Sequence, residues 1–331
     1  MADERSTIKI HVLHCGSMLV SKSVPYGGGV NLKNARRGVF DRESERVELP
    51  VSAYLIEHPK GKVLIDTGWS REISPDGVYD EKAAKSRMPG YLAAFYHPWV
   101  EKGKTVVEQL AAMGIAPEDI DIVVLTHLDA DHVSGLRVFA SKENIPVYAS
   151  HGTLSALEDA NVLNGKFSVS PIGKDGMEVG GMYVRPFSIS HDAREPFGYS
   201  VQTADGRKIS VATDTGIITE EILNAISGSD LVLLESNHDI GMLQNGPYPY
   251  AIKRRILSDL GHLSNDVCAE TAVRLLENGT TRFCLAHLSR DNNMPALAYQ
   301  TTFSEMTLSG ARQGSDYLLS VAGSDAEMMI L

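Results

Sequence analysis

The spacing of apolar and polar positions predicts strands and helices that alternate along the chain. Short runs rich in β-branched residues and bounded by turn residues predict strands over residues 8–13, 51–56, 62–65, 121–125, 182–189, 208–212, 231–234, 281–286 and 317–321. Helical patterns lie between them, over residues 104–113, 153–160, 219–226, 252–260 and 266–277. This alternation favours a layered α/β fold in which helices cover the faces of sheets.

Two stretches break this alternation, at residues 21–49 and 69–103. The first contains three consecutive glycines and many charges, and the second is interrupted by three prolines. A chain of 331 residues is long enough for one large domain. We therefore expect a single domain over residues 1–331 with excursions at these two places. Such excursions serve either as binding loops or lids, or as surface decoration.

Composition indicates an ordinary globular protein, with 43% hydrophobic and 22% charged residues. No apolar run reaches the roughly 18–20 residues that span a bilayer, so no membrane association is expected. The start of the chain lacks the pattern of a secretory signal. Cys15, Cys268 and Cys284 form no metal-type pair and no disulfide framework. A cytoplasmic location with reduced thiols follows as the expectation.

The net charge of −11 bears on the partners of the chain. A surface that binds the phosphate backbone of long duplex DNA usually has an excess of Lys and Arg. Long duplex nucleic acid is therefore a less favoured partner than a small molecule or a short phosphodiester. A homodimer is compatible with the sequence.

The strongest chemical signal follows the strand predicted at residues 121–125. Four potential metal ligands fall within six residues there: His127, Asp129, Asp131 and His132. They stand at the carboxyl end of a strand, where α/β proteins usually place their sites. Imidazole and carboxylate together suit Zn²⁺, Mn²⁺ or Fe²⁺. One loop cannot complete two metal sites, so other ligands must come from elsewhere.

Three further candidates stand just past apolar strands, namely His191, Asp214 and His287. The strands that precede them are predicted at residues 182–189, 208–212 and 281–286. Polar residues at the ends of strands can meet at one edge of a sheet. We therefore expect all three side chains to converge on the cluster that begins at His127.

In their order and spacing, these motifs resemble the metallo-β-lactamase superfamily. The segment Leu64-Ile65-Asp66-Thr67-Gly68 also resembles the strand–Asp–x–Gly signature of that fold. The resemblance covers nearly the whole chain. It implies a four-layered αβ/βα sandwich, with two mixed sheets flanked by helices. It also implies a hydrolase with two divalent metal ions and a hydroxide between them as the nucleophile.

The resemblance also implies a distribution of ligands, carried over position by position. One metal takes His127, Asp129 and His191, the other takes Asp131, His132 and His287, and Asp214 bridges the two. Most of the superfamily has His where this chain has Asp129. A carboxylate there favours Mn²⁺ or Fe²⁺ over Zn²⁺. The alternative is that Asp129 binds no metal.

The two halves of the chain resemble different branches of the superfamily. Residues 8–136 are similar to the N-acyl-homoserine-lactonase-like branch, through the segments at 12–16, 49–57 and 126–136. Residues 138–331 are similar to the YycJ/WalJ-type exonuclease branch, through the segments at 145–149, 190–199, 235–239, 255–265 and 286–289. Natural recombination, an intermediate family and an engineered fusion would each produce this pattern.

The second half adds a histidine with a mechanistic role. His262, in Gly261-His262-Leu263-Ser264-Asn265, resembles the His-bearing motif of phosphodiester-cleaving relatives. There the imidazole stabilises the transition state or protonates the leaving oxygen. His238 is assigned to catalysis, where it would orient His262 or the substrate. Helix capping for His262 and core packing for His238 are the alternatives. Three neighbouring residues are predicted to bind substrate, namely Asn237, Ser264 and Asn265.

Three functions remain open from the sequence. The first is a phosphodiesterase acting on a small or single-stranded substrate, with His262 and with Asp131 as a catalytic metal ligand. The second is a lactone or carboxylic ester hydrolase that resembles the N-acyl-homoserine lactonases. The third is a metal-binding protein without catalysis, which only Asp129 suggests.

Overall fold

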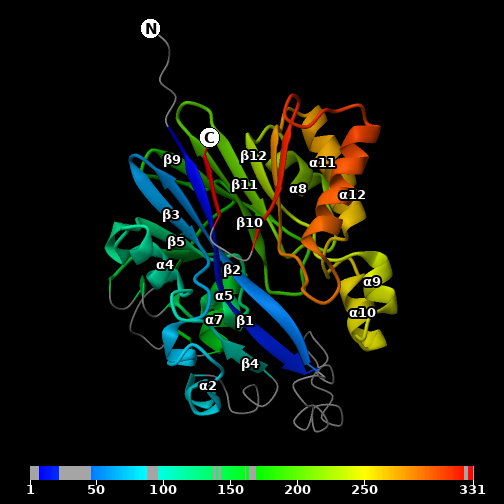
Figure 1. Cartoon of the computed structure of the whole chain (residues 1–331). Coiled ribbons are helices and arrows are strands. Elements are labelled where there is room, and N and C mark those ends of the chain that lie inside the picture. Colours follow the sequence, from blue (N-terminus) through cyan, green and yellow to red (C-terminus); the bar gives the residue numbers. More distant parts are fainter. Residues whose placement is uncertain are drawn as a thin grey trace.

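Two mixed β-sheets lie face to face, and helices cover their outer faces (Figure 1). The computed structural model describes residues 7–21, 46–87, 96–136, 139–140, 143–160, 162–163, 169–323 and 327–330, and in this part it leaves out the side chains of residues 130, 131, 327, 328 and 330. The layers confirm the α/β sandwich expected from the sequence.

The first sheet has the strand order β15-β1-β2-β3-β5-β6-β7, and β4 pairs with β1. Its strands are β1 (Lys9–Ser21), β2 (Arg46–His58), β3 (Gly61–Ile65), β4 (Tyr96–Trp99), β5 (Ile122–Val124), β6 (Val147–Ala149), β7 (Val169–Pro171) and β15 (Glu327–Ile330). Strands β1, β2 and β3 pair antiparallel, whereas β3, β5, β6 and β7 run parallel. The carboxyl ends of β3 and β5 therefore lie at the same edge.

The second sheet has the order β14-β13-β12-β11-β10-β9-β8. Its strands are β8 (Met177–Val179), β9 (Met182–Ser188), β10 (Phe197–Thr203), β11 (Lys208–Ala212), β12 (Leu231–Glu235), β13 (Arg282–Ala286) and β14 (Leu318–Val321). Strands β11 to β14 pair parallel, and β10 is antiparallel to both β9 and β11. Consequently β9, β11, β12 and β13 all end at one edge.

The helices follow the strands along the chain. They are α2 (Glu81–Arg87), α4 (Val106–Ala112), α5 (Ala130–Val133), α7 (His151–Asp159), α8 (Glu220–Ile226), α9 (Ile240–Asn245), α10 (Tyr250–Ile256), α11 (Asn265–Glu277) and α12 (Pro295–Leu308), with 3-10 turns η2 (Arg71–Ile73) and η3 (Pro117–Asp119). Of these, α4, α7, α8, α11 and α12 pack against the two outer faces. Local chemistry sets the ends of the helices. Thr105 and Glu108, for example, form a capping box that starts α4.

Among the described residues, four apolar cores hold the structure together, and the smallest packs α9 and α10 against Val47 of β2. Ile10 and Ile56 of the first sheet meet Val184 and Tyr199 of the second in the central core. An outer core packs α4 and α7 on the first sheet, and another packs α8, α11 and α12 on the second. Each fully buried Leu, Ile or Phe side chain contributes about 1.5–3 kcal/mol. The cores therefore fix the relative position of the sheet edges that carry the polar loops.

Every strand and helix predicted from the sequence has a counterpart in the described part of the chain, but some elements were missed. The pattern did not predict α12, whose apolar residues are spread around the helix, or β10, which contains Gly198, Ser200 and Gln202. The helix predicted over residues 252–260 ends at Ile256, because residues 257–261 form a turn.

The expected excursions are only partly described. Most of the excursion predicted at 21–49 lies outside the described residues, and residues 46–49 belong to β2. The stretch at 69–103 contains η2, α2 and β4. Among the described helices, none combines the length and the apolar character needed to cross a membrane.

Candidate functional site

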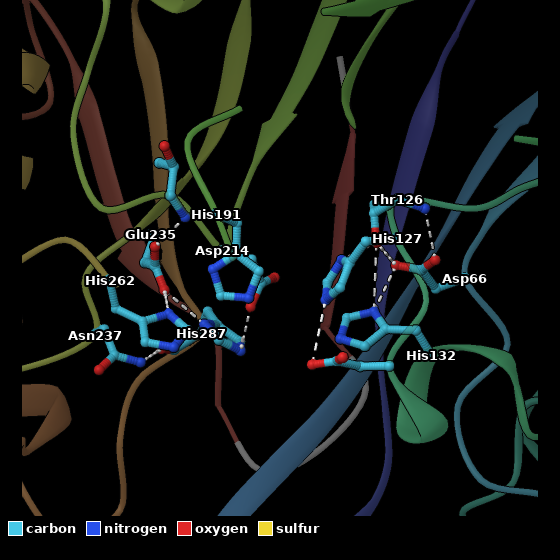
Figure 2. Close-up of polar contacts among 12 residues, drawn as sticks. Asp66, Thr126, His127, His132, His191, Asp214, Glu235, Asn237, His262 and His287 are labelled. Atoms are coloured by element: carbon cyan, nitrogen blue, oxygen red, sulfur yellow. Dashed lines mark hydrogen bonds and ion pairs between the residues drawn. The ribbon is translucent and has the colours of Figure 1, made fainter. Parts of the chain in front are cut away.

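The polar loops of the two sheets meet at one edge of the sandwich (Figure 2). Asp66 follows β3, Asp214 stands two residues after β11, and His287 follows β13. Their φ angles are 60°, 59° and 58°, in the left-handed region that residues with a side chain seldom adopt. Such backbone strain gathers where function requires a particular side-chain direction. This edge is therefore the candidate active site.

Asp66, Thr126, His127, Asp129 and His132 form the first half of the site. Asp66 is buried, and its Oδ1 and Oδ2 accept hydrogen bonds from the Thr126 amide and hydroxyl at 2.9 and 2.7 Å. The same Oδ2 lies 2.9 Å from Nδ1 of His132. His132 therefore donates from Nδ1, which leaves Nε2 as its lone-pair nitrogen.

Asp129 differs from the other members of the first half in its exposure. Its side chain is 54% exposed, and its Oδ2 lies 3.6 Å from Nε2 of the buried His127. The carboxylate therefore stands where it could share a cation with His127. Asp131 lies in α5, but its side chain is outside the described part of the chain.

His191, Asp214, Glu235, His262 and His287 form the second half of the site. Glu235 ends the fully buried strand β12, and its Oε1 lies 2.8 Å from His262 Nδ1 and 2.7 Å from His287 Nδ1. Oε2 of the same carboxylate accepts the Thr215 amide at 2.9 Å. One buried carboxylate thus orients two imidazoles. Nε2 of His287 then lies 3.3 Å from Oδ1 of Asp214.

His191 and His262 complete the second half. Nδ1 of His191 lies 3.3 Å from the carbonyl oxygen of Gly261, the residue before His262. The His262 ring lies between two others, with its centroid 5.3 Å from that of His191 and 5.3 Å from that of His287. His262 is therefore part of the cluster and not a distant capping residue.

The charges of the second half depend on one another. Burial alone would raise the pKa of Asp214, but His287 and the other imidazoles hold it well below its usual range. Burial is likewise outweighed at Glu235, whose pKa His262 and His287 lower to about 2. The pKa of His287 rises to about 9 against its burial, because Asp214 and Glu235 face it. Burial and the charge of His127 lower the pKa of His191 to about 4.

The two halves face each other across the site (Figure 2). Ligand atoms of His127, His191 and Asp214 lie within 4.8 Å of one another, and so do those of Asp214, Glu235, His262 and His287. Asp214 belongs to both groups, and its role as a ligand shared by two metal ions stays a prediction. His132 is close to His127, with ring centroids 4.3 Å apart, but it belongs to neither group.

These donors fit divalent metal ions. Nε2 of His127 is buried and has no hydrogen-bond partner in the described part of the structure. A buried imidazole nitrogen without a partner is costly unless an ion or water satisfies it. Imidazole and carboxylate donors from several loops are the ligands that Zn²⁺, Mn²⁺ and Fe²⁺ take.

The remaining predicted site residues lie beside His287 and His262. Asn237 Nδ2 donates to the His287 carbonyl oxygen at 2.9 Å. The Ser264 hydroxyl caps α11, and the buried Asn265 side chain binds Ser236 and Asn293. His238 is buried, and neither ring nitrogen has a partner among the described residues. These contacts give structural roles to Asn237, Ser264 and Asn265, and their contact with substrate stays a prediction.

The sequence did not assign a role in the site to Asp66 or Glu235. Asp66 was noted only as part of a strand signature, and Glu235 only as part of a matching segment. A charged residue that ends the wholly apolar run Leu231–Leu234 was the available signal, because buried carboxylates need partners. The identity of those partners depended on loops distant in the sequence.

Comparison with known proteins identifies both exodeoxyribonucleases and N-acyl homoserine lactonases as relatives. Residues 62–288 match the model of the beta-lactamase superfamily domain. Exodeoxyribonuclease WalJ of Streptococcus pneumoniae is 36% identical over 220 residues, which cover 65% of this chain and 81% of that protein. N-acyl homoserine lactonase AttM of Rhizobium johnstonii is 33% identical over 98 residues, which cover 30% of this chain and 34% of that protein.

These matches confirm that the sequence is similar to both branches. The match covers 65% of the chain, which is a longer stretch than residues 138–331. The similarity to the exodeoxyribonuclease therefore begins before residue 138. Among solved structures, the metallo-β-lactamase fold protein YhfI from Bacillus subtilis covers 97% of this chain and 99% of its own, with a TM-score of 0.57 and 13% identity. That likeness concerns the fold alone.

Proposed function

We propose that this chain hydrolyses a phosphodiester. The proposal starts from its family: the chain belongs to the beta-lactamase superfamily domain family and is a metal-binding hydrolase of the metallo-β-lactamase fold. The substrate class is a small phosphodiester or a short single strand, since a net charge of −11 disfavours long duplex DNA. The similarity to an exodeoxyribonuclease over 81% of that protein supports this class.

The observation that carries the proposal is the position of His262. Its ring lies between those of His191 and His287, and Glu235 accepts a hydrogen bond from its Nδ1 at 2.8 Å. The other ring nitrogen is then free to act on a substrate. Phosphodiester cleavage builds negative charge on the phosphoryl oxygens in a phosphorane-like transition state, and an imidazole N–H can stabilise that charge by donating a hydrogen bond to it.

The proposed centre holds two divalent cations, Zn²⁺, Mn²⁺ or Fe²⁺. We assign one ion to His127, Asp129 and His191 and the other to Asp131, His132 and His287. Asp214 would bind both ions. When bound, these ions supply a water of lowered pKa and neutralise charge on the ester. Asp129 makes the first position harder than an all-histidine site.

The chain's own residues prepare this centre by fixing the protonation of the imidazoles. Asp66 accepts a hydrogen bond from Nδ1 of His132, Glu235 accepts one from Nδ1 of His287, and the Gly261 carbonyl oxygen accepts one from Nδ1 of His191. Each ring then presents Nε2 as a ligand in a fixed direction. Supporting contacts of this kind usually change metal affinity or activity by about 10- to 100-fold.

His238 and the residues near it have proposed roles around His262. His238 lies next to Ser264 in an isolated bridge, and its backbone carbonyl accepts the Asn265 amide at 2.8 Å. These contacts tie the end of β12 to the start of α11. We assign His238 to orienting His262, while Asn237, Ser264 and Asn265 would line the substrate side of the same loops.

A lactone or carboxylic ester hydrolase is the second candidate. The similarity to lactonase AttM over 98 residues favours it. The same centre could polarise a carbonyl oxygen. This match covers 34% of the lactonase, whereas the match to the exodeoxyribonuclease covers 81% of that protein. The phosphodiester is therefore preferred.

A paired assay tests the choice between the two functions. The protein is loaded with Mn²⁺ or Zn²⁺, its metal content is measured, and it is assayed on bis-p-nitrophenyl phosphate and on an acyl-homoserine lactone. We expect turnover of the phosphodiester to exceed that of the lactone, and His262→Ala to reduce the first far more than the second. Turnover of the lactone alone by the metal-loaded protein would refute the proposal.

A further inference from the structure

The connection between α10 and α11, residues 257–264, carries His262 and is seated on the loop that carries His191. The Ser190 hydroxyl donates to the Asp259 carbonyl oxygen at 2.7 Å, and His191 Nδ1 lies 3.3 Å from the Gly261 carbonyl oxygen. A Cβ added at Gly216 would stand 2.3 Å from the Asp259 oxygen. The connection therefore also rests on the loop that follows Asp214.

An ion pair joins α10, just before this connection, to the residue that follows His191. Nε and Nη2 of Arg255, near the end of α10, donate to Oδ2 and Oδ1 of Asp192 at 2.6 Å each. Both side chains are four-fifths buried, with exposures of 19% and 21%. A bidentate pair fixes the relative orientation of the guanidinium and carboxylate planes as well as the distance between them. Asp192 directly follows His191, and its Oδ1 lies 3.5 Å from His191 Nε2.

A short path of contacts connects the pair to His262. The backbone amide of His262 donates to the carbonyl oxygen of Ile256, the neighbour of Arg255, at 3.1 Å. The side chain of His262 has a second anchor, at Glu235. Glu235 holds one ring atom, about which the ring could pivot, whereas the Ile256 contact fixes the backbone end of the residue. Both anchors are needed to aim the remaining ring nitrogen.

We propose that Arg255 and Asp192 are positioning residues that set the place of His262 relative to His191, and that they thereby determine a preference for phosphodiesters over carboxylic esters. The inference rests on the proposed function, because only phosphodiester cleavage is expected to use His262. A displacement of about 1 Å at a reacting group can cost about 100-fold in rate. Loss of the pair should therefore change the substrate preference while the metal ligands stay in place.

Arg255→Ala is compared with Arg254→Ala on bis-p-nitrophenyl phosphate and on p-nitrophenyl acetate. Arg254 is the matched control, since it is one residue away, carries the same charge and extends over the Tyr250 ring, 6.0 Å from its centroid. We expect Arg255→Ala to lower kcat on the phosphodiester by about 10- to 100-fold and to change acetate turnover by less than about threefold. Arg254→Ala should leave both within about twofold.

A double-mutant cycle with His262→Ala isolates the path. If Arg255 acts through His262, Arg255→Ala has no further effect on the phosphodiester once His262 is absent. Arg255→Lys keeps the charge without the bidentate geometry, so it should give an intermediate rate. It also serves if Arg255→Ala does not fold. Metal content and thermal unfolding are measured for each variant.

The outcomes separate the two proposals. Additive losses in the double mutant, or equal losses on both substrates with normal metal content, overturn the positioning role while the phosphodiesterase proposal stands. Absence of phosphodiester turnover in the metal-loaded wild-type protein overturns the proposed function itself. Loss confined to the phosphodiester and absent from the His262→Ala background supports the inference.

Discussion

The two halves of the site are built in different ways. The first half comes mostly from one loop, in which His127, Asp129 and His132 lie within six residues, supported by Asp66. The second half takes one side chain from each of five segments between His191 and His287. A local loop fixes its geometry with few contacts, whereas the second half depends on the order of the parallel strands. Damage to a single residue should therefore spread further in the second half.

Each half also has one buried carboxylate that orients imidazoles, and the two carboxylates differ in reach. Asp66 supports His132, and Glu235 supports both His262 and His287. In the proposed centre, the first arrangement would serve metal binding alone. The second connects His287, a proposed metal ligand, to His262, so the rate of phosphodiester hydrolysis should be more sensitive to Glu235 than to Asp66.

The largest effect is expected where the halves meet. Asp214 belongs to both groups of ligand atoms, so Asp214→Ala should weaken both metal positions. We expect kcat/KM to fall by about 10³-fold or more, which corresponds to about 4 kcal/mol. Steady-state kinetics and metal analysis check this. Retention of full metal content with unchanged kcat/KM would show that the halves do not share this residue.

A smaller effect should distinguish the two carboxylates. Glu235→Gln and Asp66→Asn each replace an acceptor oxygen by a donor, and each should cost about 10- to 100-fold in activity. Asp66→Asn should reduce phosphodiester and carboxylic ester turnover equally, because it acts on a metal ligand. Glu235→Gln should reduce phosphodiester turnover more, because it also releases His262. The measurement is the ratio of phosphodiester turnover to carboxylic ester turnover in each variant. The same ratio in both variants would contradict the idea that Glu235 supports His262 as well as a metal ligand.

The sequence predicted the part of this site that depends on local spacing and missed the part that depends on distant contacts. His127, Asp129 and His132 were recognisable because their spacing is local. His191, Asp214 and His287 were recognisable because each stands past an apolar strand. Glu235 and Asp66 were not assigned, because their side chains contact residues that lie 20 to 66 positions away along the chain. The pairing of Arg255 with Asp192 likewise joins residues 63 positions apart.

The fold was predictable to a similar degree. Apolar runs such as Leu231–Leu234 are buried on both faces, so their pattern is clear without tertiary information. β10 carries Gly198 and Ser200 in buried positions. The Phe187 ring lies against Gly198, and the Ser200 hydroxyl donates to the Ala225 carbonyl oxygen, and these contacts compensate for weak strand propensity. The end of α10 at Ile256 depends on the seating of Asp259 against Ser190, which no local pattern records.

A pH effect on stability is expected from the second half. Burial lowers the pKa of His238 from 6.5 to about 4. Below pH 6.5 the unfolded chain binds a proton at this residue that the folded protein does not bind until about pH 4. Stability is therefore complete above pH 6.5 and falls as the pH is lowered toward 4. Between pH 7 and pH 5 this one group should cost about 2 kcal/mol.

Urea unfolding of the metal-free protein at pH 7 and pH 5 measures this cost. His238→Gln cannot bind the proton, so it should lose less stability over the same interval. An identical loss in the variant would show that other groups cause the pH dependence.

The smallest effect is expected at Ser264, which tests a structural against a substrate-binding role. Its hydroxyl accepts the Val267 amide at 3.2 Å and caps α11. Ser264→Ala should lower the free energy of unfolding by about 1 kcal/mol, the usual cost of a lost cap. If Ser264 also binds substrate, KM rises as well. An unchanged KM with lowered stability would limit Ser264 to capping.

Metal stoichiometry tests most directly whether the two halves form one dinuclear centre. Metal-loaded wild-type protein, His127→Ala and His287→Ala are freed of excess metal and analysed for bound ions per chain. We expect two ions in the wild-type protein, one in each single variant, and loss of phosphodiester turnover in both. Two ions retained in both variants, or a fully active wild-type protein that holds a single ion, would contradict the dinuclear centre.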